Sequence, residues 1–492
     1  MKKLRRMDGN AAGDAAVLAL VRAMTMCLSL VTTRVLSTYL STFAYGTYAQ
    51  ILLIVSTTAS LTMFGLIDAI NFYYCGAAEP EKREAYVATI LTLQCCTGAA
   101  AGVLILLLAE PICGYFGNPE LRRYLAFAAV LPLLQNGISI LQVLFVSVGK
   151  ARQLAARNLV ISLAQLACAV TAGMYLRQVG LILAVAAALS VGQILFFLWS
   201  LSRSGCRIRL AACDFHLTRD ILKYSIPMAV FTLVNALNRD MDKYLISAVS
   251  DTQTLAIYAN AAKVLPFDIL LIAFMTVLLP HITRQIAAKR YGDAVETYRA
   301  YLEISYISTA LLACGVLAAA PEAMRLLYSE KYIRGLPVFR IYIVSDIFHF
   351  ANITLILTAS GRTKLLMRLG FLGLAANFVL NILFYRLMGF AGPALATLLV
   401  SLGLGITILH FSAKELHTSI RGLFDCKYLL IFALECIGGT AVFSAARRWL
   451  ETTQMHYLAV IIAVCAGYVL CVGLPNAKRF LHDLKKISTL KA

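Results

Sequence analysis

Charged residues are scarce in this chain of 492 residues. Only 14% of the residues are Asp, Glu, Lys or Arg, whereas 60% are apolar and the mean hydropathy is +0.78. A soluble protein of this length would carry about 25% charged residues. The composition therefore argues against a soluble enzyme and indicates a chain that lies largely in a lipid bilayer.

Motifs of catalysis and metal binding are also absent from the sequence. There is no GxxxxGK[ST] loop, which excludes a P-loop ATPase, and no HExxH or CxxC pair, so we expect neither a cofactor nor a metal. The 13 cysteines are scattered, mostly within apolar stretches, which favours packing as small apolar side chains. The longest predicted outer loop, 321–337, is too short for the large domain of a membrane glycosyltransferase. We therefore expect a protein that is not an enzyme.

Fourteen apolar stretches are long enough to span a bilayer, which requires about 20 residues of helix. They are 15–38, 43–70, 87–109, 122–147, 157–176, 181–201, 224–249, 255–283, 299–320, 338–359, 367–388, 391–413, 428–446 and 457–475. We expect an all-α integral membrane protein with 14 transmembrane helices, arranged as two six-helix bundles in a pseudo-two-fold relation plus two extra C-terminal helices. The predicted divisions are an N-terminal bundle at 1–201, a basic cytoplasmic linker at 202–223, a C-terminal bundle at 224–413, and two peripheral helices with a basic tail at 414–492.

The basic charge of the chain follows this topology. Lys and Arg number 44 against 25 Asp and Glu, giving a formal charge of +19. With a cytoplasmic N-terminus, 29 of these cations fall in inside segments and nine in outside segments. Cytoplasmic loops of membrane proteins carry such an excess of Lys and Arg. We therefore expect both ends to be cytoplasmic, with MKKLRRMDGN as a leader before the first span, and no nucleic-acid partner.

Polar side chains recur on one face of two predicted spans. In the first they are Arg22, Thr25, Ser29 and Thr33, with Arg34 beside them; in the seventh they are Asn235, Asn238, Arg239 and Asp242, followed by Lys243. A charged side chain at hydrocarbon depth costs at least about 2.5 kcal/mol, so such stripes tend to face a cavity or a partner. The pattern predicts a hydrated, cationic cavity suited to an anionic ligand.

A second interpretation of the same charges stays open. Arg239 could pair with Asp242, and Lys263 with Asp268. The side chains of Arg34, Asp68 and Lys243 could instead extend to the membrane interface.

The two halves of the chain share a weak sequence echo. The segment 34–50, RVLSTYLSTFAYGTYAQ, resembles 243–260, KYLISAVSDTQTLAIYAN. In both, a basic residue near a helix end is followed by a short polar loop and a Tyr-Ala pair. Repeats of this kind build many transporters around a central site.

Several segments, in this order and spacing, resemble one known family. They are ILKYSIPMAV (221–230), NRDMDKYLI (238–246), LAIYANAAKV (255–264), LLPHITR (278–284), ASGRTKLL (359–366) and LAANFVLNILFYRLMGFAGPALATLL (374–399). Together they resemble the polysaccharide biosynthesis flippases, the Wzx-type exporters of lipid-linked oligosaccharides. That family belongs to the MOP exporter superfamily, with the multidrug and toxin extrusion (MATE) transporters and the lipid II flippases.

The resemblance implies a flippase in the bacterial cytoplasmic (inner) membrane. Its substrate would be an undecaprenyl-diphosphate-linked oligosaccharide, such as an O-antigen, capsule or exopolysaccharide repeat unit, carried to the outer leaflet by alternating access. Candidate substrate-binding residues are Arg22, Arg34, Asn235, Asn238, Arg239, Lys243 and Lys263. Candidates for binding a coupling H⁺ or Na⁺ are Asp68, Asp242, Asp268 and Asp346. Membrane lipids and a glycan polymerase are the implied partners.

Two alternative functions stay open at this stage. A cation-coupled multidrug antiporter would have the same fold but acidic cavity residues. A membrane glycan polymerase or ligase would need larger outer loops than this sequence provides.

Overall fold

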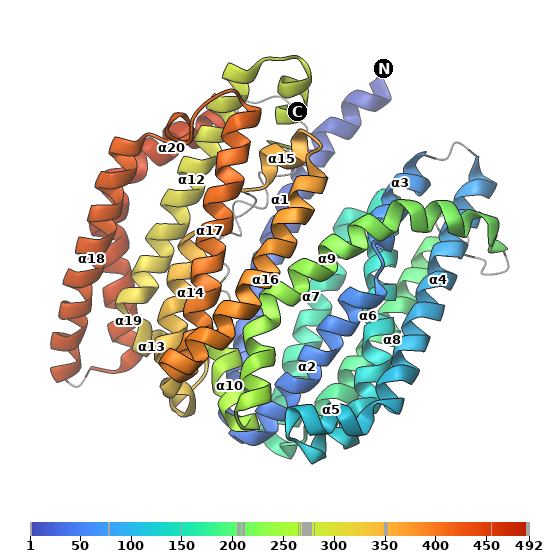
Figure 1. The fold of residues 1–492 in the computed structure, drawn as a ribbon, viewed down its shortest axis with the longest axis horizontal. Helices are drawn as coiled ribbons and strands as arrows, with labels where there is room; N and C mark the ends of the chain where they lie inside the picture. Colours follow the sequence, from blue (N-terminus) through green and yellow to red (C-terminus); the bar gives the residue numbers. More distant parts are fainter. Residues whose placement is uncertain are drawn as a thin grey trace. The chain divides into compact units, whose positions relative to one another are not determined.

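The computed structural model describes residues 2–76, 79–148, 150–203, 208, 212–263, 265, 267, 278–279, 281–348, 353–453 and 455–488. All regular secondary structure among them is helical. The chain divides into two compact units, unit 1 at Met1–Ala256 and unit 2 at Ile257–Ala492 (Figure 1). The predicted division into two six-helix bundles, a linker at 202–223 and two peripheral helices stays a prediction.

Unit 1 is built from long helices joined by short turns. Its helices are α1 (Lys2–Tyr39), α2 (Thr42–Thr62), α3 (Leu66–Gly76), α4 (Pro80–Leu107), α5 (Ala109–Phe116), α6 (Leu125–Ser147), α7 (Ala151–Cys168), α8 (Val179–Ser202), α9 (His216–Val249) and the start of α10 (Thr252–Ala261). A 3₁₀ turn at Pro119–Tyr124 leads into α6, and a π-helix at Ala169–Leu176 extends α7.

The predicted span at 43–70 is interrupted, because α2 ends at Thr62 and α3 begins at Leu66. Between them, Phe64 and Gly65 both adopt positive φ angles, 47° and 66°. A helix cannot continue through left-handed backbone, and the apolar composition of the segment gave no sign of this turn.

Helix α6 lies at the centre of the packing in unit 1. It contacts α2, α3, α4 and α8, while α1 packs along α7. Its buried residues, among them Ile140, Leu144 and Phe145, join an apolar core with residues of α3, α4 and α8. This apolar burial stabilises the unit and fixes the helices that carry its polar groups.

One glycine sets the distance between α2 and α10 within unit 1. A Cβ atom on Gly46 would lie 2.1 Å from the carbonyl oxygen of Thr252. Only glycine allows two backbones to approach this closely.

Unit 2 contains the remaining α-helices given for the described residues. They are α12 (Tyr291–Ala318), α13 (Ala320–Leu327), α14 (Leu336–Phe348), α15 (Leu355–Ala359), α16 (Thr363–Met388), α17 (Gly392–Glu415), α18 (Cys426–Thr452), α19 (Tyr457–Tyr468) and α20 (Leu474–Ser488). Helix α12 is the most buried of the long apolar helices and contacts α14, α18, α19 and α20.

Ion pairs and close packing hold the last helices of the chain against α12. Arg479 on α20 donates hydrogen bonds to Glu303 of α12 and to Asp425, which caps α18, each at 2.9 Å. Tyr468 of α19 packs closely against Gly315 of α12. A Cβ atom added to Gly315 would lie 3.3 Å from the ring of Tyr468. The helices after α17 are therefore an integral part of unit 2.

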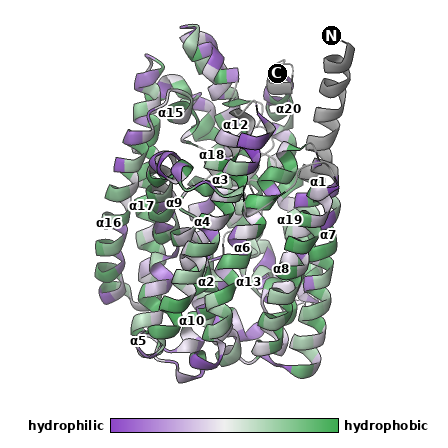
Figure 2. Ribbon diagram, turned by 90° about the vertical axis from the view of Figure 1, so that its right-hand side faces the viewer, coloured by the Kyte–Doolittle hydropathy of each residue, from purple (hydrophilic) through white to green (hydrophobic). Residues whose placement is uncertain are grey.

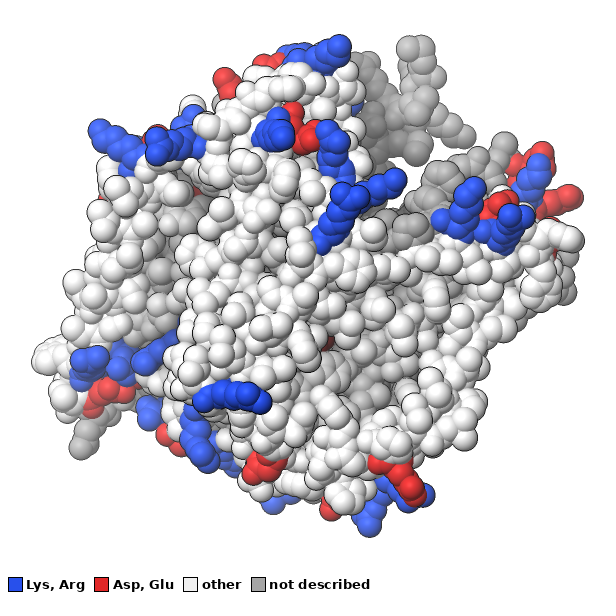
Figure 3. Space-filling model, viewed as in Figure 1, with Lys and Arg blue, Asp and Glu red and all other residues white. Residues whose placement is uncertain are grey.

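Nine segments of the described residues are long and apolar enough to cross a membrane. One of them, Thr363–Glu415, holds both α16 and α17, which fold back on one another at a turn where Gly389 has φ 64° (Figure 1). Figure 2 shows hydrophobic residues along most of the helix lengths. On the face drawn in Figure 3, Lys and Arg gather near helix ends and leave an uncharged surface between them.

The predicted class, an all-α integral membrane protein, is confirmed by these helices. Four predicted spans fall outside the nine segments: 43–70, 224–249, 255–283 and 338–359. Two of these, 255–283 and 338–359, contain residues outside the described ranges. The exact number of 14 spans stays a prediction.

Candidate functional site

The predicted cationic stripe on α9 forms a compact ion cluster. Lys243 donates from Nζ to Oδ1 of Asp240 at 2.7 Å, and Arg239 approaches Oδ2 of the same carboxylate at 3.4 Å. The side chain of Asp240 is 11% exposed, whereas that of Arg239 is 62% exposed. The acid is thus held inward while the guanidinium is presented at the surface of the helix.

The partner of Arg239 differs from the expected one. The second interpretation of the sequence pairs Arg239 with Asp242, but the ion pair forms with Asp240. Asp242 is buried, and its Oδ1 accepts a hydrogen bond from the backbone N of Lys243 at 2.8 Å. Asp240 was missed because it lies off the i, i+4 stripe; its i, i+3 spacing to Lys243 was the signal that could have identified it.

The two amides of the stripe lie one turn earlier on α9. Asn235 is exposed and Asn238 is half-buried. With Arg239 they form a polar surface of donors and acceptors on a helix that otherwise packs in unit 1. Such groups suit a hydroxyl-rich, anionic ligand.

Hydrogen bonds place this part of α9 against α2 and α5. The hydroxyl of Tyr244 lies 2.5 Å from Oγ1 of Thr57 and also donates to the carbonyl of Leu53 at 3.3 Å. Tyr115 on α5 donates to the carbonyl of Tyr244 at 3.0 Å. The ion cluster of α9 is therefore anchored one residue away by bonds to two other helices.

On α1 the two predicted arginines differ in exposure. Arg22 is exposed and Arg34 is half-buried. The stripe hydroxyls beside them bond back to their own helix, from Thr25 to the carbonyl of Arg22 at 2.9 Å and from Thr33 to that of Ser29 at 3.0 Å. Because these hydroxyls donate to the helix backbone, the two guanidinium groups are the stronger candidates for binding a ligand.

In unit 2 the structure brings Asp346 next to the segment that carries Lys263. The carboxylate of Asp346 on α14 is buried and accepts a hydrogen bond from the backbone N of Leu265 at 3.2 Å. Two other predicted acids cannot be placed in this way. Asp268 lies outside the described residues, and for Asp68 only the backbone, in α3, is described.

A buried amide network at one end of unit 1 was not foreseen. Asn118 donates to Oε1 of Gln50 at 2.7 Å and to Oγ1 of Thr47 at 2.9 Å, while Gln50 donates to the carbonyl of Phe116 at 3.2 Å. Burial makes such bonds costly to break, so they fix α2 against the turn after α5. The network joins residues more than 60 positions apart, and no local spacing could have revealed it.

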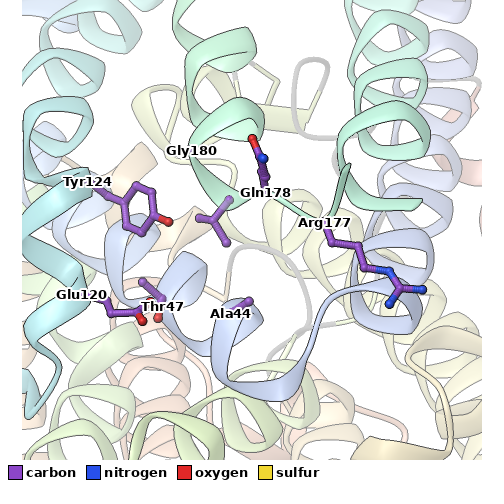
Figure 4. A pocket seen from close by; sticks show the side chains of 8 residues that line it. Ala44, Thr47, Glu120, Tyr124, Arg177, Gln178 and Gly180 are labelled. Carbon is purple, nitrogen blue, oxygen red and sulfur yellow. The ribbon is translucent and has the colours of Figure 1, made fainter. Parts of the chain in front are cut away.

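A small polar hollow adjoins this network (Figure 4). Its volume is about 290 Å³, and its lining includes Thr47, Glu120, Tyr124, Arg177 and Gln178. In Figure 4, Glu120 and Thr47 lie together on one side, and the guanidinium of Arg177 is directed away from them. The hollow is bounded by the turns before α2, α6 and α8, which the predicted topology places outside.

Among the described residues, no group of three or more His, Cys, Asp or Glu side chains is arranged to hold a metal ion. The polar groups brought together by the structure are cations, carboxylates and amides on helices. Their chemistry is that of binding charged and hydroxylated groups.

Residues 35–337 match the model of one protein family, described as polysaccharide biosynthesis protein. The chain belongs to this family. No curated protein matches the sequence of the chain.

Three solved structures that share the fold are distant in sequence. The lipid II flippase MurJ in its inward closed conformation has 15% identity and a TM-score of 0.71, covering 94% of this chain and 99% of its own. An inward-facing multidrug resistance MATE family transporter of the MOP superfamily has 15% identity and a TM-score of 0.64, covering 82% of this chain and 98% of its own. A MOP superfamily transporter from Pyrococcus furiosus, described as having a binding pocket of reverse polarity, has 15% identity and a TM-score of 0.57, covering 82% of this chain and 94% of its own.

These comparisons confirm the resemblance predicted from the sequence. This chain has the helical membrane fold shared by lipid II flippases and MATE transporters of the MOP superfamily. At this level of identity the structural likeness establishes the fold alone.

Proposed function

We propose that this protein is a flippase for an undecaprenyl-diphosphate-linked oligosaccharide. The observation that carries the proposal is the charge arrangement on α9, in a chain that matches a polysaccharide biosynthesis family. Arg239 is exposed while its partner Asp240 is nearly buried, so the surface offered to a ligand is cationic. A diphosphate headgroup is the kind of anion that a guanidinium binds strongly.

The proposed mechanism addresses the cost of moving a charged headgroup across about 30 Å of hydrocarbon. A polar cavity that opens alternately to each face supplies dipoles and water in place of bulk solvent. In this proposal Arg22, Arg34, Arg239, Lys243 and Lys263 neutralise the diphosphate. Asn235 and Asn238 bond sugar hydroxyls, and the lipid tail stays in the bilayer.

Direction and location complete the proposal. The headgroup moves from the cytoplasmic to the outer leaflet of the bacterial inner membrane, and both ends of the chain are cytoplasmic, as the distribution of Lys and Arg predicts. The glycan is an O-antigen, capsule or exopolysaccharide repeat unit, which a glycan polymerase would then extend.

Coupling to a cation gradient is the second part of the proposal. Asp242 and Asp346 are both buried acids on helices, each accepting a backbone N–H. A buried carboxylate in a membrane protein is typical of proton or Na⁺ pathways. Together with Asp68 and Asp268, they are proposed to bind the coupling H⁺ or Na⁺.

The test is restoration of glycan export in a strain deleted for this gene. Arg22→Ala, Arg239→Ala and Lys263→Ala are each expected to reduce export and to cause the lipid-linked intermediate to accumulate. Arg122→Ala is the matched control, because Arg122 is an exposed loop cation paired with exposed Glu110. Normal export by all three cavity variants would contradict the proposal.

Two assays separate the flippase from its alternatives. Uptake of organic cations by the purified protein in vesicles, with no movement of lipid-linked glycan, would identify an antiporter. Extension of glycan chains by the purified protein would identify a polymerase or ligase. Identification of the sugars on the accumulated intermediate would name the substrate.

A further inference from the structure

A crevice of about 600 Å³ lies between α7 and α8 of unit 1, apart from the groups proposed to bind the transported substrate. Its polar lining gathers near the start of α7 and the end of α8, where Gln153, Arg157, Gln193 and Ser200 lie. The predicted topology places this end of the two helices at the cytoplasmic face.

Arg157 is the central charge of this crevice. One of its terminal nitrogens, Nη2, donates to Oε1 of Gln193, and its guanidinium lies over the ring of Phe197, 4.6 Å from the centroid. The other two nitrogens, Nε and Nη1, are buried and have no hydrogen-bond partner among the described residues. None of the described residues that line the crevice is acidic. A buried guanidinium with unsatisfied N–H groups is costly, and an anion would remove that cost.

A second cation borders the same end of the crevice. Lys150 donates from Nζ to the carbonyl and the hydroxyl of Ser200, at 2.7 and 2.9 Å. Trp199 also lines the crevice and is 53% exposed, and the guanidinium of Arg203 lies over its ring at 4.2 Å. Tryptophan beside basic residues is typical of the membrane–water interface.

The rest of the lining is apolar and extends away from the charges. It includes Val160 and Ile161 on α7 and Ala188 and Leu189 on α8. On α8 the crevice runs along the 12 residues from Leu189 to Ser200, which rise about 16 Å along the helix. Val160 is 62% exposed, so the apolar part is open at its rim. One cationic end and one apolar side match an amphiphile better than a water-soluble anion.

We propose that this crevice binds a phospholipid with an anionic headgroup in the leaflet facing the cytoplasm. The phosphate lies at Arg157 and Gln193, with Lys150 adding positive charge, and one acyl chain lies along Val160, Ile161 and Leu189. A small rotation of the guanidinium turns Nε and Nη1, now closed off from water, toward the phosphate oxygens. Basic pockets between membrane helices on this side bind anionic lipid headgroups in other proteins.

The test measures binding of defined lipids to the purified full-length chain. Phosphatidylglycerol is titrated by native mass spectrometry and by thermal unfolding in detergent, alongside phosphatidylcholine and inorganic phosphate. Phosphatidylglycerol is expected to bind and to raise the melting temperature, and the other two are not. Arg157→Gln is expected to weaken phosphatidylglycerol binding by about tenfold, the loss of one charge-assisted contact.

Two further variants make the result decisive. Leu189→Trp fills the apolar part of the crevice without changing charge, and it is expected to reduce lipid binding even if Arg157→Gln does not fold. Arg177→Gln, an exposed arginine at the far end of the same helix pair, is the control and is expected to bind like the unmodified chain. Equal binding of phosphatidylcholine, stabilisation by inorganic phosphate alone, or unchanged binding in Leu189→Trp would overturn the proposal.

Discussion

Lys243 and Arg239 share the single carboxylate of Asp240, which lies one residue after the arginine and three before the lysine. The contact with Lys243 is the shorter of the two, at 2.7 Å. The side chains of Lys243 and Asp240 are both mostly buried, at 17% and 11% exposed. Asp240 therefore determines the position of the cationic surface on α9, although it does not belong to that surface.

Removal of the Asp240 charge should destabilise this cluster. Asp240→Asn leaves the mostly buried Lys243 without a carboxylate contact among the described residues, and we expect a loss of about 1.5 to 3 kcal/mol, seen as a lower melting temperature. The double variant Asp240→Asn, Lys243→Gln should recover part of the loss, because the buried charge is also removed. An unchanged melting temperature in the single variant would show that the pair contributes nothing.

Gly46→Ala should disrupt the contact between α2 and the start of α10. The added Cβ would meet a backbone oxygen at 2.1 Å, which no side-chain rotation can relieve. Overpacking of this kind typically costs about 1 to 3 kcal/mol, so the melting temperature should fall. Gly114→Ala is the control, because nothing lies within 4 Å of the Cβ it would introduce. Equal melting temperatures for the two variants would contradict the close approach.

The ion pair between Arg447 on α18 and Glu322 on α13 should contribute to the stability of unit 2. Nη1 of Arg447 lies 3.1 Å from Oε1 of Glu322, and the two side chains are 10% and 1% exposed. Removing one partner of a buried pair typically costs about 3 to 5 kcal/mol, so Arg447→Met should lower the melting temperature strongly. The neighbouring Arg448 is exposed, and Arg448→Met should change little. If Glu322→Gln and Arg447→Met add independently in the double variant, the two residues are not coupled.

The contribution of Asp425 to stability should depend on pH. Hydrogen bonds, first from Arg479 and then from the backbone N–H of Tyr428, hold the pKa of Asp425 below its usual range. A lowered pKa in the folded state means that the stabilisation is fully present above the ordinary Asp pKa of about 3.9. It is lost as the pH falls through the lower folded value.

Asp425→Asn tests this pH dependence. Its melting temperature should lie below that of the unmodified chain at pH 7, and the gap should close as the pH falls below about 4. The side chain of Asp425 is 35% exposed, so solvent screening should limit the effect to about 1 kcal/mol or less. A gap that stays constant over this range would mean that the carboxylate charge does not matter.

The helices were predictable because hydropathy depends on local composition. Most predicted apolar stretches became membrane-length helices, such as α8 at the predicted span 181–201. The break at Phe64–Gly65 was not predictable, since two residues of left-handed backbone change neither length nor composition. The charge imbalance also depends only on composition, and the topology it predicts stays a prediction.

The candidate site was predictable only in part, because helical spacing reports which residues share a face and not which atoms meet. Spacing singled out Arg239 and Lys243 and offered Asp242 as one possible partner of Arg239, whereas the structure pairs Arg239 with Asp240. Asn377 and Asn381, four residues apart on α16, are buried and bond to each other at 3.0 Å. The network of Gln50 with Asn118 and the crevice at Arg157 depend on packing between helices, which one sequence does not reveal.

The anchoring of α18 by Arg447 has a practical consequence for following this protein in solution. The chain has two tryptophans, Trp199 in unit 1 and Trp449 in unit 2, and both are exposed. Trp449 lies two residues after Arg447, on the part of α18 that this arginine joins to Glu322. Each unit thus carries one native fluorophore, and replacing either indole with Phe leaves an optical reporter for the other half of the molecule.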